Sequence, residues 1–258
     1  MKSSDSDRVA VLVDTTRCMG CRACQVACKQ WNQLPGEKTE FRGTYENPPH
    51  LSADTWTKIQ FHEFADSAPK WRFRKQQCYH CEDASCVNVC PTGAANKRPN
   101  GIVVIDQSIC AGCKYCIEAC PYQTPKFSEE KGTAIKCRFC YDRVENGLAP
   151  ACVTACATGA LFFGKRDEVL AEARRRRDAR AGSVIYGETE LGGLGWITLV
   201  DRKVAELGLI ENPKAATKGI LAKWLAGVIP GVAILAGLGW LFKRRSQLAE
   251  KPAGEKKA

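Results

Sequence analysis

Sixteen cysteines in four groups of four constrain this 258-residue chain more than any other feature. Every group begins with two cysteines separated by two residues and ends with two separated by three, so the groups form an internal repeat. The groups are Cys18, Cys21, Cys24 and Cys28 (group 1); Cys78, Cys81, Cys86 and Cys90 (group 2); Cys110, Cys113, Cys116 and Cys120 (group 3); and Cys137, Cys140, Cys152 and Cys156 (group 4). Such a repeat predicts that the thiols act in sets, as metal ligands or as disulfides.

The spacing favours iron-sulfur clusters over the two alternatives. Disulfides are the weaker interpretation, because thiols on one tight loop do not easily reach disulfide geometry. Zinc remains an alternative, since four thiolates from such pairs can close a tetrahedral site. Groups 1 and 3, however, have the C-x2-C-x2-C-x3-C spacing of two-cluster ferredoxins, in which the last cysteine binds the other cluster. The repeat therefore predicts four [4Fe-4S] clusters.

Groups 2 and 4 are variants of the same motif. Group 2 widens one gap to four residues, and group 4 has eleven residues between its second and third cysteines. The insert of group 4, YDRVENGLAPA, is polar and contains Asn-Gly and Pro, which is typical of a loop. Both groups are followed by a (P/A)-T-G-A sequence. Because the fourth cysteine of each group binds the cluster of another group, the groups must pair two by two. Spacing alone allows adjacent pairing, of group 1 with 2 and group 3 with 4, or nested pairing, of group 1 with 4 and group 2 with 3.

The charge balance agrees with buried clusters better than with nucleic-acid binding. The formal net charge is +10 when every thiol is counted as neutral. An oxidised [4Fe-4S] core with four thiolates carries about −2, so four clusters lower the sum by about 8, to about +2. Five basic residues lie in or beside the cysteine groups, as this account expects: Arg22, Lys29, Lys114, Lys136 and Arg138. We therefore expect no nucleic-acid partner.

Short apolar runs between the groups predict strands, and we expect the cysteines on loops and short helices between them. The predicted strands are Val9–Asp14, Thr57–Phe64, Gly101–Asp106, Gly159–Gly164 and Trp196–Val200. A helix is predicted for Arg166–Arg180, which starts with acidic and ends with basic residues, as suits the helix dipole. The expected fold class is α+β.

The segment Trp224–Phe242 is predicted to span a membrane, because its nineteen residues carry no charge and a tryptophan lies near each end. Three lysines precede it within fifteen residues, and six Lys or Arg follow it within fifteen. This asymmetry predicts a cytoplasmic C-terminal tail and an extracytoplasmic cysteine domain. We expect no export signal in the first residues, which have only a five-residue apolar run and no twin arginine.

Four stretches together carry a family resemblance: VDTTRCMGCRACQVACKQWNQLP, QCYHCEDASCVNVCPTGA, NGIVVIDQSICAGCKYCIEACPYQTPKF and KCRFCYDRVENGLAPACVTACATGALFFGKRDEV. They resemble the four-cluster electron-transfer (beta) subunit of membrane-bound respiratory formate dehydrogenases. They are similar, less closely, to the matching subunits of membrane-bound hydrogenases and of dimethyl sulfoxide and polysulfide reductases. The resemblance implies two pseudo-symmetric dicluster ferredoxin-like modules with one C-terminal transmembrane helix.

The resemblance also implies nested pairing of the groups. The implied ligands are Cys18, Cys21, Cys24 and Cys156 for cluster 1; Cys28, Cys137, Cys140 and Cys152 for cluster 2; Cys78, Cys81, Cys86 and Cys120 for cluster 3; and Cys90, Cys110, Cys113 and Cys116 for cluster 4. The expected division is a four-cluster domain (1–165), a helix and connecting segment (166–219), the transmembrane helix (220–243) and a basic cytoplasmic tail (244–258).

The implied function is electron transfer within anaerobic respiration, without catalysis by this chain alone. His50, His62 and His80 have no matched nucleophile, and all cysteines are assigned to clusters. The resemblance implies a large molybdenum- or tungsten-pterin catalytic subunit as donor and a membrane cytochrome b subunit that reduces quinone as acceptor. A signal-bearing catalytic subunit would carry the folded domain across the membrane. The alternatives are the equivalent subunit of a nickel-iron hydrogenase or of another pterin oxidoreductase, and, in a different class, a zinc-stabilised membrane adaptor.

Overall fold

A computed structural model describes residues 7–65, 70–216 and 237–241. The chain divides into two compact units, Met1–Ala216 and Thr217–Ala258. The first unit contains all sixteen cysteines. The architecture of the functional site is therefore the architecture of the first unit.

A four-stranded sheet joins segments from distant parts of the first unit. Its strands are β8 (Leu161–Lys165), β1 (Val9–Asp14), β10 (Trp196–Val200) and β9 (Val184–Tyr186), in that spatial order. Strands β1 and β10 are parallel, with Val11 opposite Trp196, and the two outer pairings are antiparallel. The residues before group 1 and the residues after group 4 therefore share one sheet.

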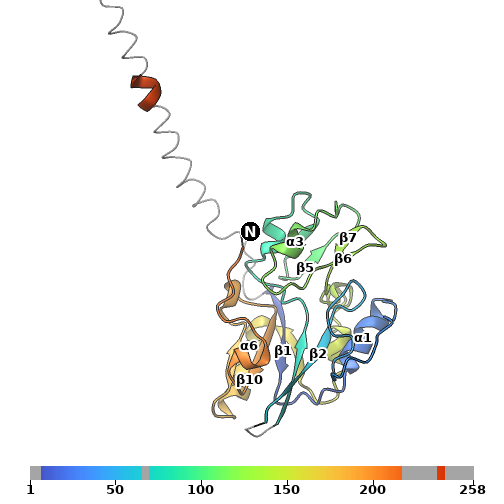
Figure 1. The fold of residues 1–258 in the computed structure, drawn as a ribbon. Coiled ribbons are helices and arrows are strands. Elements are labelled where there is room, and N and C mark those ends of the chain that lie inside the picture. Colours follow the sequence, from blue (N-terminus) through green and yellow to red (C-terminus); the bar gives the residue numbers. More distant parts are fainter. Residues whose placement is uncertain (1–6, 66–69, 217–236, 242–258) are drawn as a thin grey trace, which may run out of the picture. The chain divides into compact units, whose positions relative to one another are not determined.

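Both faces of this sheet are covered, and strand β1 shows why its sequence is apolar throughout. Successive side chains of a strand point to opposite faces. Ala10 and Leu12 pack against the helix α6 (Arg166–Asp178), whereas Val11 and Val13 belong to the core on the cysteine side. All four side chains are buried. Figure 1 shows α6 lying along the sheet beside β1 and β10.

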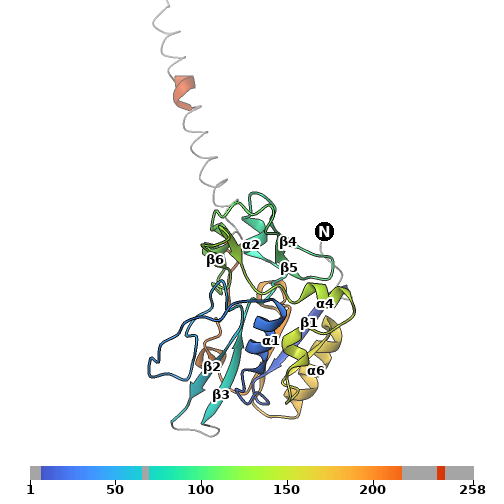
Figure 2. The ribbon, with the colours of Figure 1, turned by 90° about the vertical axis from the view of Figure 1, so that its right-hand side faces the viewer.

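The remaining elements in the described part of the first unit are two-stranded hairpins, short helices and single-turn 3-10 helices. The hairpins are β2 (Lys58–Glu63) with β3 (Trp71–Gln76), β4 (Ala95–Lys97) with β5 (Val103–Ile105), and β6 (Lys126–Ser128) with β7 (Thr133–Ile135). The helices are α1 (Ala23–Trp31), α2 (Ser85–Asn88), α3 (Tyr115–Glu118), α4 (Tyr141–Glu145), α5 (Ala151–Thr154), η2 (Glu190–Gly192) and η3 (Val204–Leu207). Figure 2 shows α2, β4, β5 and β6 gathered at one end of the unit, and α1, β2, β3 and the large sheet at the other.

The predicted strands are confirmed within small shifts of their ends. Val9–Asp14 and Trp196–Val200 are strands over the whole predicted range, and β2, β5 and β8 occupy the other three predicted segments. The predicted helix from Arg166 is α6. The fold is mixed α and β, as expected.

The predicted membrane segment Trp224–Phe242 lies outside the described residues except for positions 237–241, which are helical. Within the parts of the chain that the structure describes, no helix is both long enough and apolar enough to cross a bilayer.

Candidate metal centres

Each cysteine group has its third cysteine on a short helix. Helix α1 carries both Cys24 and Cys28, while α2, α3 and α5 carry the third cysteines Cys86, Cys116 and Cys152. In every group the fourth cysteine comes four residues after the third. Side chains four residues apart are neighbours on a helix face. Helix α1 therefore offers two thiols to two adjacent sites, and in the other groups the fourth thiol follows shortly after the end of the helix.

The loops before these helices repeat the same backbone conformation. In group 1, Gly20 and Arg22 have φ angles of 70° and 62°, and in group 3, Gly112 and Lys114 have φ angles of 66° and 65°. At Gly112 an added Cβ would lie 2.4 Å from the carbonyl oxygen of Gly132, so no side chain fits there. The C-x-G-C sequence thus encodes a loop whose left-handed positions curl the first cysteines around one point.

Helix packing brings the groups together in pairs. Helix α1 packs against α5, and α2 packs against α3. Helix α1 is also held on the β2–β3 hairpin, because the Gln25 side-chain oxygen accepts a hydrogen bond of 2.7 Å from the Ile59 N–H. Group 1 therefore lies against group 4, and group 2 lies against group 3.

Three cavities are each lined by four cysteines, and each cavity draws its cysteines from two groups. We refer to these residues as sets. Set 1 is Cys18, Cys21, Cys24 and Cys156; set 2 is Cys28, Cys137, Cys140 and Cys152; and set 3 is Cys78, Cys81, Cys86 and Cys120. The thiols of each set surround a cavity. Among the described residues, no three His, Cys, Asp or Glu side chains come close enough together to hold a single metal ion.

The other four cysteines, Cys90, Cys110, Cys113 and Cys116, form set 4. Burial, followed by the neighbouring thiols of Cys110, Cys113 and Cys90, raises the pKa of Cys116 to about 11. Cys110 also packs against the group of buried hydrophobic residues that contains Cys116. These contacts place the members of set 4 near one another on the α2–α3 side of the unit.

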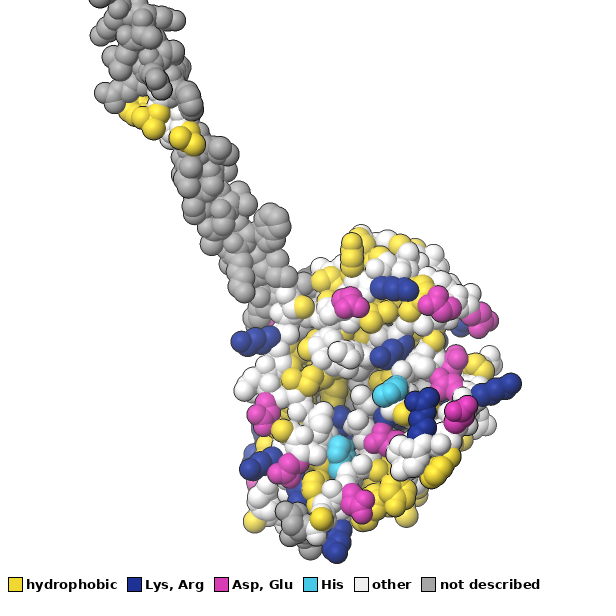
Figure 3. Space-filling view, viewed as in Figure 1, with side chains coloured by type: hydrophobic (Ala, Val, Ile, Leu, Met, Phe, Trp, Pro, Cys, Tyr) yellow, Lys and Arg dark blue, Asp and Glu magenta, His cyan; other side chains and the backbone are white. Residues whose placement is uncertain are grey.

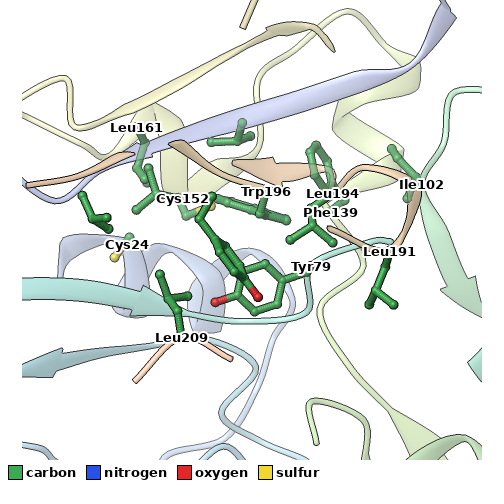
Figure 4. Packing of buried hydrophobic residues seen from close by; sticks show 14 of the residues in the cluster. Cys24, Tyr79, Ile102, Phe139, Cys152, Leu161, Leu191, Leu194, Trp196 and Leu209 are labelled. Atoms are coloured by element: carbon green, nitrogen blue, oxygen red, sulfur yellow. The ribbon is translucent and has the colours of Figure 1, made fainter. Parts of the chain in front are cut away.

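The sets follow one another in a row. Lys75 lines the cavities of both set 1 and set 2. Cys28 and Cys137 of set 2 pack in one group of buried hydrophobic residues with Cys78 of set 3. Cys86 of set 3 packs in a second such group with Cys116 of set 4. Figure 4 shows Cys152 of set 2 next to the buried Trp196, with Cys24 of set 1 farther to the left. The row ends at two exposed cysteines, Cys21 in set 1 and Cys113 in set 4.

The environment of the thiols suits an iron-sulfur core. All sixteen cysteines are free thiols. Burial raises the pKa of Cys24, Cys86 and Cys137 to about 12, so these thiols keep their protons at neutral pH until a cation displaces them. Four soft sulfur donors around a small, mainly apolar cavity are the ligand set that a [4Fe-4S] cluster requires. The residues therefore fit the cofactor that the spacing predicts.

The fourth cysteine of each group has a side-chain partner that the sequence did not reveal. Sγ of Cys28 lies 3.7 Å from Nδ2 of Asn32. The hydroxyls of three threonines lie at similar distances from the other fourth cysteines: Thr92 at 3.7 Å from Cys90, Thr124 at 3.6 Å from Cys120, and Thr158 at 3.8 Å from Cys156. Thr92 and Thr158 belong to the shared (P/A)-T-G-A sequence, so that repeat was the available clue. Donors to cluster sulfurs are one of the means by which a protein sets cluster potential.

His80 and Lys136 lie between sets 2 and 3. His80 is 1% exposed, and its Nδ1 accepts a hydrogen bond of 3.0 Å from the Val103 N–H. Burial, helped by the charge of Lys136, lowers the pKa of His80 well below its usual range, so the imidazole is neutral. The Lys136 ammonium donates to the carbonyl oxygens of Val103 and Cys137. His80 therefore has a buried structural position next to the cysteines.

One face of the first unit shows no concentration of positive charge (Figure 3). On the face shown in Figure 3, acidic and basic side chains are interspersed over the described residues. Eight basic residues are instead buried: Arg8, Lys58, Arg72, Arg74, Lys75, Lys136, Arg166 and Arg176. Of these eight, Lys75 lines the cavities of sets 1 and 2, and Lys136 donates to the carbonyl oxygen of Cys137.

Four sets of four cysteines in a mixed α/β fold define an iron-sulfur electron-transfer protein. Residues 17–94 and residues 69–166 each match the family described as 4Fe-4S dicluster domain. The first unit is accordingly built from two dicluster ferredoxin-like domains that bind [4Fe-4S] clusters.

Comparison with curated proteins gives the particular family. The chain is 44% identical to the nitrate-inducible formate dehydrogenase iron-sulfur subunit of Escherichia coli K12, over 90% of this chain and 81% of that protein. It is 39% identical to the formate dehydrogenase-O iron-sulfur subunit of the same organism, over 81% and 73% of the two chains. It is 31% identical to the hydrogenase-2 operon protein HybA of Escherichia coli O157:H7, over 96% and 88%. The chain belongs to the family of electron-transfer iron-sulfur subunits of formate dehydrogenase- and hydrogenase-type complexes, which are not catalytic on their own.

Proposed function

We propose that this chain holds four [4Fe-4S] clusters, one in each of sets 1 to 4, and passes electrons along the row between two partner subunits. The observation that carries the proposal is the cavity geometry: sets 1 to 3 each line one cavity, and each cavity combines cysteines of two groups. A [4Fe-4S] cluster supplies one-electron storage at a potential set by its surroundings. The chain supplies the ligands, their order and the exclusion of water.

The two ends of the row are the proposed points of exchange. The inner sets contain no exposed cysteine: all four cysteines of set 2 are buried, and set 3 has two buried and two half-buried cysteines. Cys21 and Cys113 are the exposed cysteines, and they belong to the outer sets. A partner that docks near either residue comes closer to that set than to any inner set.

The donor we propose is a molybdenum- or tungsten-pterin catalytic subunit that oxidises formate. The relatives that are 44% and 39% identical to this chain are both named as formate dehydrogenase iron-sulfur subunits. A hydrogenase-type donor is the second candidate, because the hydrogenase-2 operon protein matches 96% of this chain at 31% identity. Identification of the large subunit that co-purifies with the chain distinguishes the two.

The acceptor we propose is a membrane cytochrome b subunit at the set 4 end of the row. The first unit ends at Ala216, whose N–H donates a hydrogen bond of 3.1 Å to the Ser85 hydroxyl, next to Cys86 of set 3. The chain thus leaves the first unit near sets 3 and 4, eight residues before the uncharged segment that begins at Trp224. We propose that this segment anchors the chain in the membrane, with the cluster domain on the periplasmic side and the basic tail in the cytoplasm.

Iron and acid-labile sulfide analysis tests the cluster count directly. The purified chain, prepared without oxygen, should contain about sixteen iron atoms and about sixteen sulfides. About four zinc atoms without sulfide would contradict the redox function and support the zinc-stabilised adaptor. About eight irons would leave the dicluster family intact and contradict four clusters.

A further inference from the structure

Lys75 is the buried cation that two cysteine cavities share. It lies on β3, is 2% exposed and lines the cavities of set 1 and set 2. The Lys75 ammonium interacts electrostatically with Cys24 of set 1 and with Cys28, Cys137 and Cys152 of set 2. The ammonium is thus placed at the junction of two proposed clusters.

Three other buried basic residues near the sheet and hairpin pair with carboxylates, whereas Arg74, also on β3, has neutral partners, which include the Tyr79 hydroxyl and the Gln60 side-chain oxygen. Arg72 pairs with Asp201, Lys58 with Glu46 and Arg176 with Asp14. Among the described residues, no carboxylate lies within ion-pair distance of Lys75, whose Nζ has only a 3.4 Å contact with the Gln77 side-chain oxygen and a 4.2 Å approach to the Trp196 ring centroid. A buried charge without a counter-ion is costly. The negative charge of two thiolate-bound clusters is the compensation available at this place.

The surrounding elements hold the Lys75 side chain in this position. Lys75 is opposite Ile59 in the β2–β3 hairpin, and Ile59 lines the cavity of set 1. Trp196, over which the ammonium lies, is fully buried and is fixed by the pairing of β10 with β1. The ammonium therefore cannot turn to solvent without unpacking the hairpin from the sheet.

We infer that Lys75 is a positioning residue for electron transfer, a fixed positive charge that raises the reduction potentials of clusters 1 and 2 together and keeps that pair matched. This inference rests on the proposed function, because it requires clusters in sets 1 and 2. A positive charge stabilises the reduced cluster, which carries one more negative charge, more than the oxidised one. Sharing one charge between two adjacent sites shifts both potentials in the same direction.

The test is a redox titration of the purified full-length chain, followed by electron paramagnetic resonance, for the wild type and for Lys75→Met. Methionine keeps the length and the apolar contact with Trp196 but removes the charge. Signals are assigned to sets 1 and 2 by their loss in Cys18→Ala and Cys140→Ala. We expect the ratio of oxidised to reduced cluster at a fixed potential to rise at least tenfold for clusters 1 and 2. This rise corresponds to a reduction potential lowered by about 59 mV for a one-electron couple. Clusters 3 and 4 should be unchanged.

Lys29→Met is the matched control. Lys29 follows Cys28 in the sequence, but its ammonium donates to the carbonyl oxygens of Pro35 and Asp54 and does not line either cavity. This variant should shift the ratio of each cluster less than threefold. An equal shift in both lysine variants would show a general charge effect and overturn the inference.

The sign of the shift separates charge from packing. Damage to the packing would admit water, which favours the more negative reduced state and raises the potentials. Unchanged or raised potentials in Lys75→Met would therefore overturn the inference while the four clusters remain. Absence of four distinct clusters in the wild type would instead contradict the proposed function.

Discussion

Replacing Cys156 by alanine should remove the cluster of set 1 and lower the iron content from about sixteen to about twelve atoms per chain. Cys156 lines the same cavity as Cys18, Cys21 and Cys24, although it lies in the last cysteine group. The loss of one of four ligands leaves the remaining three thiols to hold a core that needs four. Iron and sulfide analysis with electron paramagnetic resonance of the purified chain measures the result.

Double variants show which cysteines share a cluster. If Cys18 and Cys156 bind the same cluster, the variant with both replaced by alanine should retain about twelve irons, as each single variant does. The matched control replaces Cys140 and Cys156, which belong to one group but line different cavities, and should retain about eight. If the Cys18 and Cys156 double variant retained about eight irons, as adjacent pairing requires, the nested pairing would be wrong.

Deleting residues 217–258 should move the chain from the membrane fraction to the soluble fraction with its iron content unchanged. The deleted part contains the nineteen uncharged residues from Trp224 to Phe242. As a helix they would extend about 28 Å, close to the thickness of about 30 Å of the hydrocarbon core. The first unit, Met1–Ala216, is compact by itself and keeps every cysteine. Fractionation should use the chain expressed without partner subunits, which could otherwise retain it.

A pair of point variants gives the control for this deletion. Changing both Ile229 and Leu235 to arginine opposes insertion by about 2.5 to 3.5 kcal/mol for each arginine at the helix centre and should also release the chain. Changing Ile229 to leucine and Leu235 to isoleucine keeps the segment apolar and should leave the chain in the membrane fraction. Retention of both the deleted and the arginine forms in the membrane would refute the proposed anchor.

Local patterns in the sequence predicted the secondary structure well. The apolar run Val9–Asp14 predicted β1, and the acidic start and basic end of the segment after Lys165 predicted α6. Group spacing also predicted clustered thiols, because the repeat C-x2-C and C-x3-C depends only on neighbouring residues. These features are local, so the order of residues is enough to specify them.

Long-range pairing could not be obtained in the same way. Nothing in the run Trp196–Val200 indicates that it pairs in parallel with β1, more than 180 residues earlier. Spacing likewise left adjacent and nested pairing open, because it says nothing of the contacts of α1 with α5 and of α2 with α3. The ligand assignment of the four sets stays a prediction until iron is located.

The buried basic residues show a second limit of sequence patterns. The strand WRFRKQ, with three basic residues in six, suggests a solvent-exposed face, yet Arg72, Arg74 and Lys75 are all buried. Conversely, Lys114 follows Cys113 in the sequence, yet its side chain is half-exposed in the structure and its ammonium lies over the ring of Phe127. Position next to a cysteine therefore did not indicate which cations face the thiols, because the tertiary packing decides it.

An iron anomalous difference map from crystals of the anaerobically purified complex tests the central claim most directly. Data collected on both sides of the iron absorption edge should show four separate cluster-sized peaks in a row, one bordered by each set, with Cys156 at the first peak and Lys75 between the first and second. Fewer than four peaks, peaks that appear only at the zinc edge, or a first peak bordered by Cys28 in place of Cys156 would contradict the proposed arrangement.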